Sequence, residues 1–209
     1  MPWSKAHKEE THRRIVETAA AALRRQGLAG IGVAELMRAA ALTHGGFYAH
    51  FPSKEALIAE ALAHAGEQSQ RWYGAVAATA AAEAKLQKIV DAYLTPRHCA
   101  HPEQGCAVAA LGGEVAREGG AVGEVLRRSI EEQLDLLARL APGGDRKARE
   151  RQAIGAFAAM IGGLILARGI GEGRESERLL AELRAFLHQA LASPPARPRR
   201  VGRQRPKRG

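Results

Sequence analysis

Hydrophobic residues recur through most of this chain at spacings of three and four, the period at which side chains share one face of an α-helix. In the first such segment, 7–26, Ile15, Ala19 and Leu23 form one stripe, and Gly27 follows where a helix would end. Comparable segments are 33–40, 44–50, a long one from residue 54, 83–94, 102–118, 122–141, 145–168 and 179–191. Because no stretch alternates β-branched and polar residues, the pattern predicts an all-α fold of about nine helices.

The composition is typical of closely packed helices in a soluble protein. Aromatic residues make up only 4% of the chain, so its core must come mainly from Ala, Leu, Ile and Val. The longest uncharged apolar stretch, 153–167, has 15 residues, fewer than the roughly 20 that cross a membrane. The N-terminal residues are polar and do not resemble a signal peptide, and two cysteines cannot build a disulfide scaffold. We therefore expect a cytoplasmic protein with no membrane association.

Positive charge is concentrated at the C-terminal end of the chain. The formal net charge is +9, and the segment 194–209 holds seven Lys and Arg residues and no acidic residue. This composition predicts a disordered basic tail that attracts polyanions, chiefly nucleic acid; a solvated end without a specific role is the alternative. The chain is expected to divide into a compact unit at 1–52, a larger helical body at 53–193 and this tail.

Segment 32–54 has the most informative pattern. Two short helices are joined there by a tight turn at 41–43. Leu36, Phe47 and Phe51 supply a small apolar core that would fix the angle between them, as in a helix-turn-helix.

Two adjacent glycines lie at the start of the second of these helices. Glycine costs about 1 kcal/mol inside a helix, so Gly45 and Gly46 indicate a place where the backbone approaches something closely. The N–H groups of this first turn could then meet the phosphates or base edges of DNA.

This segment strongly resembles the tetracycline-repressor (TetR) family of bacterial transcriptional regulators. The resemblance rests on the motif Leu42-Thr43-x-Gly45-x-x-Tyr48-x-His50-Phe51-x-x-Lys54-Glu55-x-Leu57. It covers roughly residues 10–60 by motif, and the rest of the chain by the number and order of helices. The resemblance implies an N-terminal helix-turn-helix unit of three helices and a C-terminal helical domain that binds a ligand and dimerises. It also implies a repressor that a small molecule releases from DNA.

The resemblance further implies which residues contact DNA. Four match family positions that usually touch the DNA backbone: Thr43, Tyr48, His50 and Lys54. Three match positions that face the major groove: His44, Gly45 and Gly46. Their chemistry is suitable, because a lysine at a helix N-terminus adds charge for a phosphate and a histidine can donate to guanine. The expected partner is a near-palindromic double-stranded DNA operator, bound by a homodimer.

Two residues depart from the family pattern. Gly32 stands where the family usually has a Thr or Ser that caps the next helix, which puts one phosphate contact in doubt. Ala41 stands where the family usually has Gly. If this turn needs a positive φ, Ala41 would carry strain of about 1 kcal/mol.

Small residues lie at heptad spacing in the segment 145–168 and just beyond it. Glycines at seven-residue intervals allow two helices to approach closely, and the last amphipathic segment supplies a stripe beside them. We therefore predict a homodimer interface formed by Gly155, Ala158, Ala159, Gly162, Ile165, Gly169, Leu183, Phe186 and Leu187. The alternative is that these glycines accommodate contacts within one chain.

A pocket for a small-molecule effector is expected among the middle helices, because apolar walls with a few polar groups are typical of such sites. The candidate lining residues are Trp72, Leu86, Ile89, Val90, Tyr93, Cys106, Ala110, Leu126, Ile130, Phe157 and Ile161. The same residue types also build a plain core, so each of them has that second interpretation.

A few further motifs bear on metal binding, redox response and catalysis. His98, Cys99, His101 and Cys106 lie close together, but their spacing matches no usual zinc pattern, so we expect no metal or other cofactor. Cys106 near a helix start leaves a thiol- or redox-responsive regulator as an alternative. A non-specific nucleic-acid-binding protein dominated by the tail is another. The chain has no catalytic triad order, phosphate-binding loop or HExxH motif, so an enzyme is not expected.

Overall fold

A computed structural model describes residues 5–30 and 32–192, and the predicted basic tail lies outside them. Over these residues the chain is all-α, as predicted. The nine α-helices are α1 (Lys5–Gln26), α2 (Val33–Ala39), α3 (Lys54–Ala78), α4 (Lys85–Tyr93), α5 (Pro96–Ala100), α6 (Ala107–Glu118), α7 (Gly120–Leu140), α8 (Arg146–Ile170) and α9 (Arg174–Ala192). Three short 3₁₀-helices join them: η1 (His44–Ala49), η2 (Ala82–Ala84) and η3 (Pro102–Gln104).

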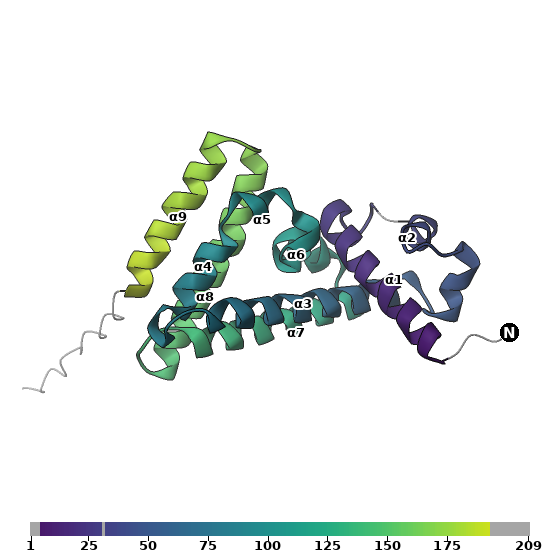
Figure 1. The fold of residues 1–209 in the computed structure, drawn as a ribbon, viewed down its shortest axis with the longest axis horizontal. Coiled ribbons are helices and arrows are strands. Elements are labelled where there is room, and N and C mark those ends of the chain that lie inside the picture. The colour runs from purple at the N-terminus through teal and green to yellow at the C-terminus, as the bar shows by residue number, and fades with distance from the viewer. Residues whose placement is uncertain (1–4, 31, 193–209) are drawn as a thin grey trace, which may run out of the picture.

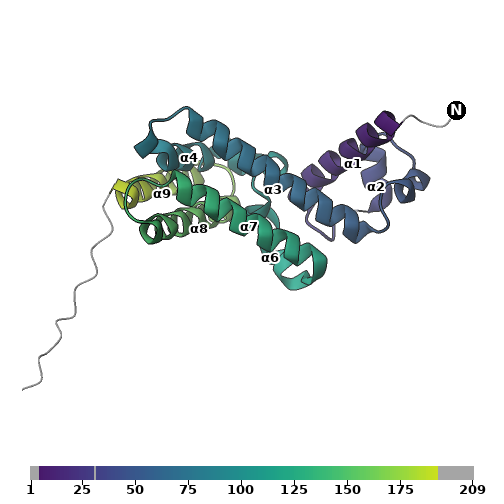
Figure 2. The same cartoon turned by 90° about the horizontal axis from the view of Figure 1, so that it is seen from below.

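The helices form two groups around two apolar cores, and α3 contributes to both (Figures 1 and 2). The N-terminal core joins α1, α2 and η1 to the first half of α3, where Leu57 and Ala61 are fully buried. Residues of α6 and α7 close this core from the other side. The second core lies among the second half of α3, α4, α7, α8 and α9. One helix therefore runs from the small N-terminal group into the helical body.

The start of α3 is fixed by a side-chain cap, as the sequence predicts. The hydroxyl of Ser53 accepts a hydrogen bond from the backbone N–H of Ala56 at 3.1 Å. Farther along, α3 lies against α7 so closely that a Cβ on Gly66 would come within 2.4 Å of the Ser129 hydroxyl oxygen. Glycine is therefore needed at this crossing.

The turn between α2 and η1 is a Schellman motif that contains an alanine. The N–H of Leu42 donates to the carbonyl oxygen of Met37 at 2.8 Å, and the N–H of Ala41 donates to that of Arg38 at 3.0 Å. Ala41 has φ of 57°, the left-handed conformation that glycine adopts most easily. The expected strain at this residue is therefore present.

The structure adds one short helix to those predicted and divides another. Pro96 opens α5, because the Thr95 hydroxyl accepts a hydrogen bond from the N–H of His98 and caps this helix. The helix expected from Pro102 onward is interrupted after η3, because Gly105 adopts extended backbone angles. Cys106 consequently becomes the N-cap residue of α6.

Among the described residues, α8 is long and apolar enough to cross a membrane by length and composition alone. Ala153, Met160 and Leu164 of this helix are fully buried in the second core, and α8 packs along α7 and α9. The helix is thus longer than the 15-residue stretch that the sequence indicated, and the core helix of a helical bundle passes the same test of length and composition.

Candidate nucleic-acid interface and ligand cavity

The element η1 separates buried aromatic residues from an exposed one. Phe47 and Phe51 are almost fully buried, with ring centroids 5.7 Å apart, and anchor η1 to the N-terminal core. Tyr48 stands edge-on to Phe47 but is 72% exposed, and no other large hydrophobic residue of the described chain is exposed to this extent. A rigid support thus holds a phenol ring out in solvent.

The other predicted DNA-contacting residues lie in η1, directly beside it in sequence or at the start of α3. Thr43 is exposed at the start of η1, and its hydroxyl makes no capping bond. A Cβ on Gly45 would meet nothing within 4 Å, so packing inside the chain does not explain that glycine; one on Gly46 would make only ordinary contacts. Lys54 is the first residue of α3 and is half-buried. His44 is the first residue of η1, but its side chain lies outside the described part of the structure.

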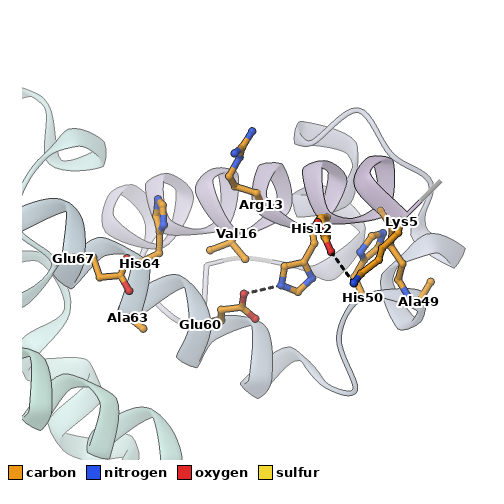
Figure 3. A pocket seen from close by; sticks show the side chains of 12 residues that line it. Lys5, His12, Arg13, Val16, Ala49, His50, Glu60, Ala63, His64 and Glu67 are labelled. Carbon is orange, nitrogen blue, oxygen red and sulfur yellow. Dashed lines mark hydrogen bonds and ion pairs between the residues drawn. The ribbon is translucent and has the colours of Figure 1, made fainter. Parts of the chain in front are cut away.

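His50 lies in a groove between α1 and α3 and is only partly accessible (Figure 3). Its Nδ1 atom is buried without a hydrogen-bond partner, so only the other ring nitrogen remains for a phosphate. Burial lowers the pKa of His50, and the nearby His12 and Lys8 lower it further. The His12 ring stacks on Phe51, and its Nε2 lies 2.6 Å from the Glu60 carboxylate.

A second hollow, with a volume of about 780 Å³, lies among α3, α4, α5, η3 and the start of α6. Its wall combines aromatic, polar and charged side chains. The residues that line it are Arg24, Gln68, Ser69, Trp72, Tyr73, Val76, Ala92, Tyr93, Thr95, Arg97, His98, His101, Glu103, Gln104, Gly105 and Cys106. Its size suits a small organic ligand.

Two buried phenols in this cavity wall are not satisfied by the protein. Tyr73 and Tyr93 are each 1% exposed, and neither hydroxyl has a hydrogen-bond partner among the described oxygen and nitrogen atoms. Burial raises the pKa of both phenols, and the Cys106 thiol raises it further. Both hydroxyls are therefore neutral, and both are buried in the wall of the cavity.

His98 ties two parts of the cavity wall together. Its Nδ1 lies 2.8 Å from the Tyr93 carbonyl oxygen, and its Nε2 accepts from the backbone N–H of Cys106 at 3.1 Å. This pattern requires a neutral ring that donates from Nδ1. Burial lowers the pKa of His98, which favours that form. With both nitrogens occupied, His98 has no lone pair for a metal ion, and no described group of three His, Cys, Asp or Glu residues is arranged to bind one.

The cavity contains only part of the pocket expected from the sequence. Trp72, Tyr93 and Cys106 line it. The other eight predicted residues do not, because they pack into the two cores: Leu86, Ile89, Val90, Phe157 and Ile161 in the second core, Ala110 and Leu126 in the N-terminal core, and Ile130 against both. Sequence reasoning missed the polar wall, including Arg24 and Tyr73, because nothing in their local sequence distinguishes them from other helical positions.

The predicted interface residues lie mainly on an exposed face of α8 and α9. A Cβ on Gly155, Gly162 or Gly169 would meet nothing within 4 Å, so these glycines make room for no contact inside the chain. Gly163 of the same helix does make room for a contact inside the chain, since a Cβ there would come within 2.5 Å of the Leu183 side chain. Ala158, Ile165 and Phe186 are exposed and Ala159 is half-buried, whereas Leu187 points into the core at 3% exposure and Leu183 is partly buried beside it.

The N-terminal part of the chain matches a known family. Residues 15–61 match the family described as "Bacterial regulatory proteins, tetR family". This segment contains α2, η1 and the start of α3. No curated protein is a significant match to the chain.

Solved structures share the arrangement of helices over most of the chain. A TetR transcriptional regulator from Chloroflexus aurantiacus J-10-FL is 25% identical, with a TM-score of 0.70 over 87% of this chain and 96% of that one. A TetR-family regulator from Cytophaga hutchinsonii is 20% identical, with a TM-score of 0.74 over 90% and 98%. E. coli NemR in its reduced form is 18% identical, with a TM-score of 0.69 over 83% and 95%.

The matched segment and the shared fold lead to one assignment. The helix-turn-helix predicted from the motif is present, and the larger helical body follows it in the same order as in these regulators. Residues 15–61 carry the helix-turn-helix domain of the TetR family of bacterial regulatory proteins, and the described chain shares the fold of solved TetR-family regulators.

Proposed function

We propose that this protein is a cytoplasmic homodimeric repressor that binds a near-palindromic DNA operator and is released by a small, mostly apolar effector. The observation that carries the proposal is the outward face of η1, where a rigidly supported Tyr48 lies in solvent beside an open glycine backbone. Such a face suits a DNA groove, because backbone and phenol can both reach phosphates without side-chain obstruction.

Each residue of this face has a role in the proposal. Tyr48 donates its hydroxyl to a phosphate oxygen, and Lys54 adds a positive charge where the α3 N-terminus already favours an anion. Thr43 and His50 make further backbone contacts. His44, Gly45 and Gly46 enter the major groove, and the lack of side chains at the glycines leaves much of the sequence preference to DNA shape.

The dimer is supported by where apolar surface is exposed. Seven large hydrophobic residues of the described chain are exposed, and five of them lie on α8 and α9: Ile154, Ile165, Leu166, Ile170 and Phe186. The open glycines Gly155, Gly162 and Gly169 lie on α8. Exposed apolar residues gathered on two neighbouring helices are typical of a protein–protein interface, and two-fold pairing would present two reading elements to successive major grooves.

Sedimentation of interface variants tests the dimer. The double substitution Ile165→Glu and Phe186→Glu places charge on the exposed face without touching the core, so we expect a folded monomer at micromolar concentration. Ala75→Glu on the exposed side of α3 is the matched control and should sediment like the wild type. A wild-type monomer at that concentration would contradict the dimer.

The position of α3 supports release by an effector in the cavity. Lys54 begins this helix at the DNA-binding face, and Trp72, Tyr73 and Val76 near its other end line the cavity. A ligand that favours one orientation of α3 therefore also changes the position of the reading elements. A ligand that bound both orientations equally would release nothing.

Operator affinity tests the DNA-binding face. DNA selected from a random pool supplies the operator, and fluorescence anisotropy measures its Kd. We expect Tyr48→Ala and Lys54→Ala each to weaken binding by about tenfold or more, the usual loss for a hydrogen bond to a charged group. Lys88→Ala, an exposed lysine of α4, is the control and should bind like the wild type. Unchanged affinity in both variants, with intact circular dichroism, would reject this face.

A thiol-responsive regulator is the second candidate, because Cys106 lines the cavity as a free thiol. The other free thiol, Cys99, is less suited, since burial raises its pKa. Operator binding that survives peroxide treatment unchanged would eliminate this candidate.

Deletion of 194–209 tests the role of the tail. We expect weaker DNA binding with the same operator preference, whereas loss of that preference would favour a protein that binds nucleic acid non-specifically.

A further inference from the structure

Arg24 is a buried charge without a carboxylate partner. Its side chain is 7% exposed; Nε donates to the Glu103 carbonyl oxygen at 2.9 Å, and Nη1 donates to Gln68 Oε1 at 3.2 Å. A guanidinium has five N–H donors, so three remain. Within the described residues no carboxylate lies at ion-pair distance from Arg24, and the carboxylate of Glu103 pairs with His101 instead, at 3.1 Å. Buried charges are normally paired, which makes this one unusual.

The same cavity wall has two further donors, the hydroxyls of Tyr73 and Tyr93. That of Tyr73 has no partner, and that of Tyr93 has only the Cys106 thiol, a weak hydrogen-bonding group. The charged residues of the wall are two arginines, Arg24 and Arg97, against one glutamate, so the lining is net positive. Unpartnered donors and a positive lining call for a ligand rich in acceptors and negatively charged.

The remaining wall favours a flat aromatic body. The Trp72 ring lies edge-on to Tyr73 and to Tyr93, with centroid distances of 5.4 and 6.5 Å. Val76 and Ala92 add apolar surface. Aromatic rings prefer such offset and edge-to-face neighbours, so a further ring is stabilised among them beyond its burial alone.

We infer that the cavity binds an aromatic carboxylic acid, with its carboxylate held by Arg24 and the Tyr73 and Tyr93 hydroxyls and its ring beside Trp72. The site itself stands on these contacts; only its role as the effector site rests on the proposed function.

The position of Arg24 gives the bound carboxylate a direct connection to the DNA-binding domain. Arg24 lies in the last turn of α1, whose residues form much of the N-terminal core. Its present partners, Glu103 of η3 and Gln68 of α3, belong to other elements. A carboxylate that takes the free guanidinium donors binds the residue that joins α1 to η3 and α3, so occupancy and the placement of α1 are coupled.

Calorimetric titration of the full-length protein with 2-naphthoate, its neutral isostere 2-naphthamide and the aliphatic decanoate tests the inference. For the wild type we expect the acid to bind about tenfold or more tightly than the amide, the difference for a charged hydrogen bond. Arg24→Gln should lose this preference. Arg25→Gln, which removes the adjacent and exposed arginine of α1, should keep it.

Equal affinity for acid and amide, retention of the preference in Arg24→Gln, or no binding of either probe would overturn the inference. Tighter binding of decanoate than of 2-naphthoate would overturn its aromatic part. An Arg24-dependent preference for the acid that leaves operator affinity unchanged supports the site and contradicts the effector role.

A measurement on the unmutated protein covers the case in which Arg24→Gln does not fold. The Arg24 Nε–H resonance in a ¹⁵N spectrum, assigned with Arg24→Lys, should shift on addition of 2-naphthoate and stay in place with 2-naphthamide. A resonance that moves with neither probe, or equally with both, rejects the carboxylate contact.

Discussion

The chain has three tyrosines, and they contrast the DNA-binding face with the cavity. Tyr48 is 72% exposed on η1, where water satisfies its hydroxyl until a partner replaces it. Tyr73 and Tyr93 are 1% exposed, and their hydroxyls are buried without a described oxygen or nitrogen acceptor. A polar group on the outside costs the fold nothing, whereas an unsatisfied one inside costs about 1–3 kcal/mol. The exposed hydroxyl therefore costs the folded state little free energy, whereas the buried hydroxyls lower the free energy of unfolding.

Gly66 lies on α3 between these two regions, and we expect its substitution to have the largest effect on folding. In Gly66→Ala the new Cβ would come within 2.4 Å of the Ser129 hydroxyl oxygen, so the free energy of unfolding should fall by about 1–3 kcal/mol in urea denaturation. Gly74→Ala on the same helix meets nothing within 4 Å and should instead gain about 0.5–1 kcal/mol.

A double-mutant cycle identifies the cause of that loss. Ser129→Ala removes the oxygen that the new methyl group would meet, so it should recover part of the stability lost in Gly66→Ala. Additive effects of the two substitutions would show that the α3–α7 crossing is not the source.

Removing a hydroxyl from each region tests the comparison directly. Tyr73→Phe deletes an unsatisfied buried donor, so we expect the free energy of unfolding to rise by about 1 kcal/mol while affinity for 2-naphthoate falls. Tyr48→Phe should leave stability within about 0.5 kcal/mol of the wild type, the usual range for surface changes, and weaken operator binding. If Tyr73→Phe were less stable than the wild type, its hydroxyl would have a partner after all.

Acid should weaken the cavity region through His98. Burial lowers the folded-state pKa of His98 below its ordinary value of 6.5, so the unfolded chain binds the extra proton first. Stability contributed by the neutral ring is therefore complete above pH 6.5 and is lost as pH falls below it, by at most about 1.4 kcal/mol per pH unit.

Urea denaturation at pH 7.5 and 5.5 measures this loss. The fall should be smaller in His98→Gln, which has no proton to gain. His50, in the DNA-binding region, also has a lowered pKa. The loss of stability between the two pH values is therefore measured in His50→Gln as well, and compared with that in His98→Gln. A pH dependence identical in wild type and His98→Gln would contradict the assignment.

The turn at Ala41 has the smallest expected effect. Glycine would relieve about 1–2 kcal/mol of left-handed strain but lose about 0.4–1 kcal/mol to a more flexible unfolded chain. We expect Ala41→Gly to raise the free energy of unfolding by up to about 1 kcal/mol and to leave ligand binding in the cavity unchanged. A loss of stability would show that this turn tolerates alanine without strain.

The DNA-binding region could be predicted because its determinants are local. The turn, its aromatic support and Ser53 lie within one short segment, and the helix period and turn chemistry fix how they fold. The positive φ at Ala41 meets the condition raised by the family resemblance, whose pattern usually has Gly there. The roles assigned to the individual DNA-contacting residues stay predictions, as does the boundary at 52, since α3 contributes to both cores.

The cavity could not be predicted because it is assembled from distant segments. Arg24 reaches Glu103 across 79 residues of sequence, and no periodic pattern encodes that meeting. Leu86 and Ile89 have the same apolar signature that a pocket would have, yet the packing places them in the core. Core and pocket differ in which polar atoms lack partners, and this appears only once the helices are placed.

The open glycines of α8 have a consequence for choice of partner. A surface that lacks side chains at every seventh position resists a small change of register, because a shift of three or four residues brings Ile165 onto a gap. Under the proposed dimer, a paralogous regulator with bulky residues at these positions could not come close enough to pair. Under that proposal, the missing side chains would favour pairing of this chain with its own copies over pairing with such a paralogue.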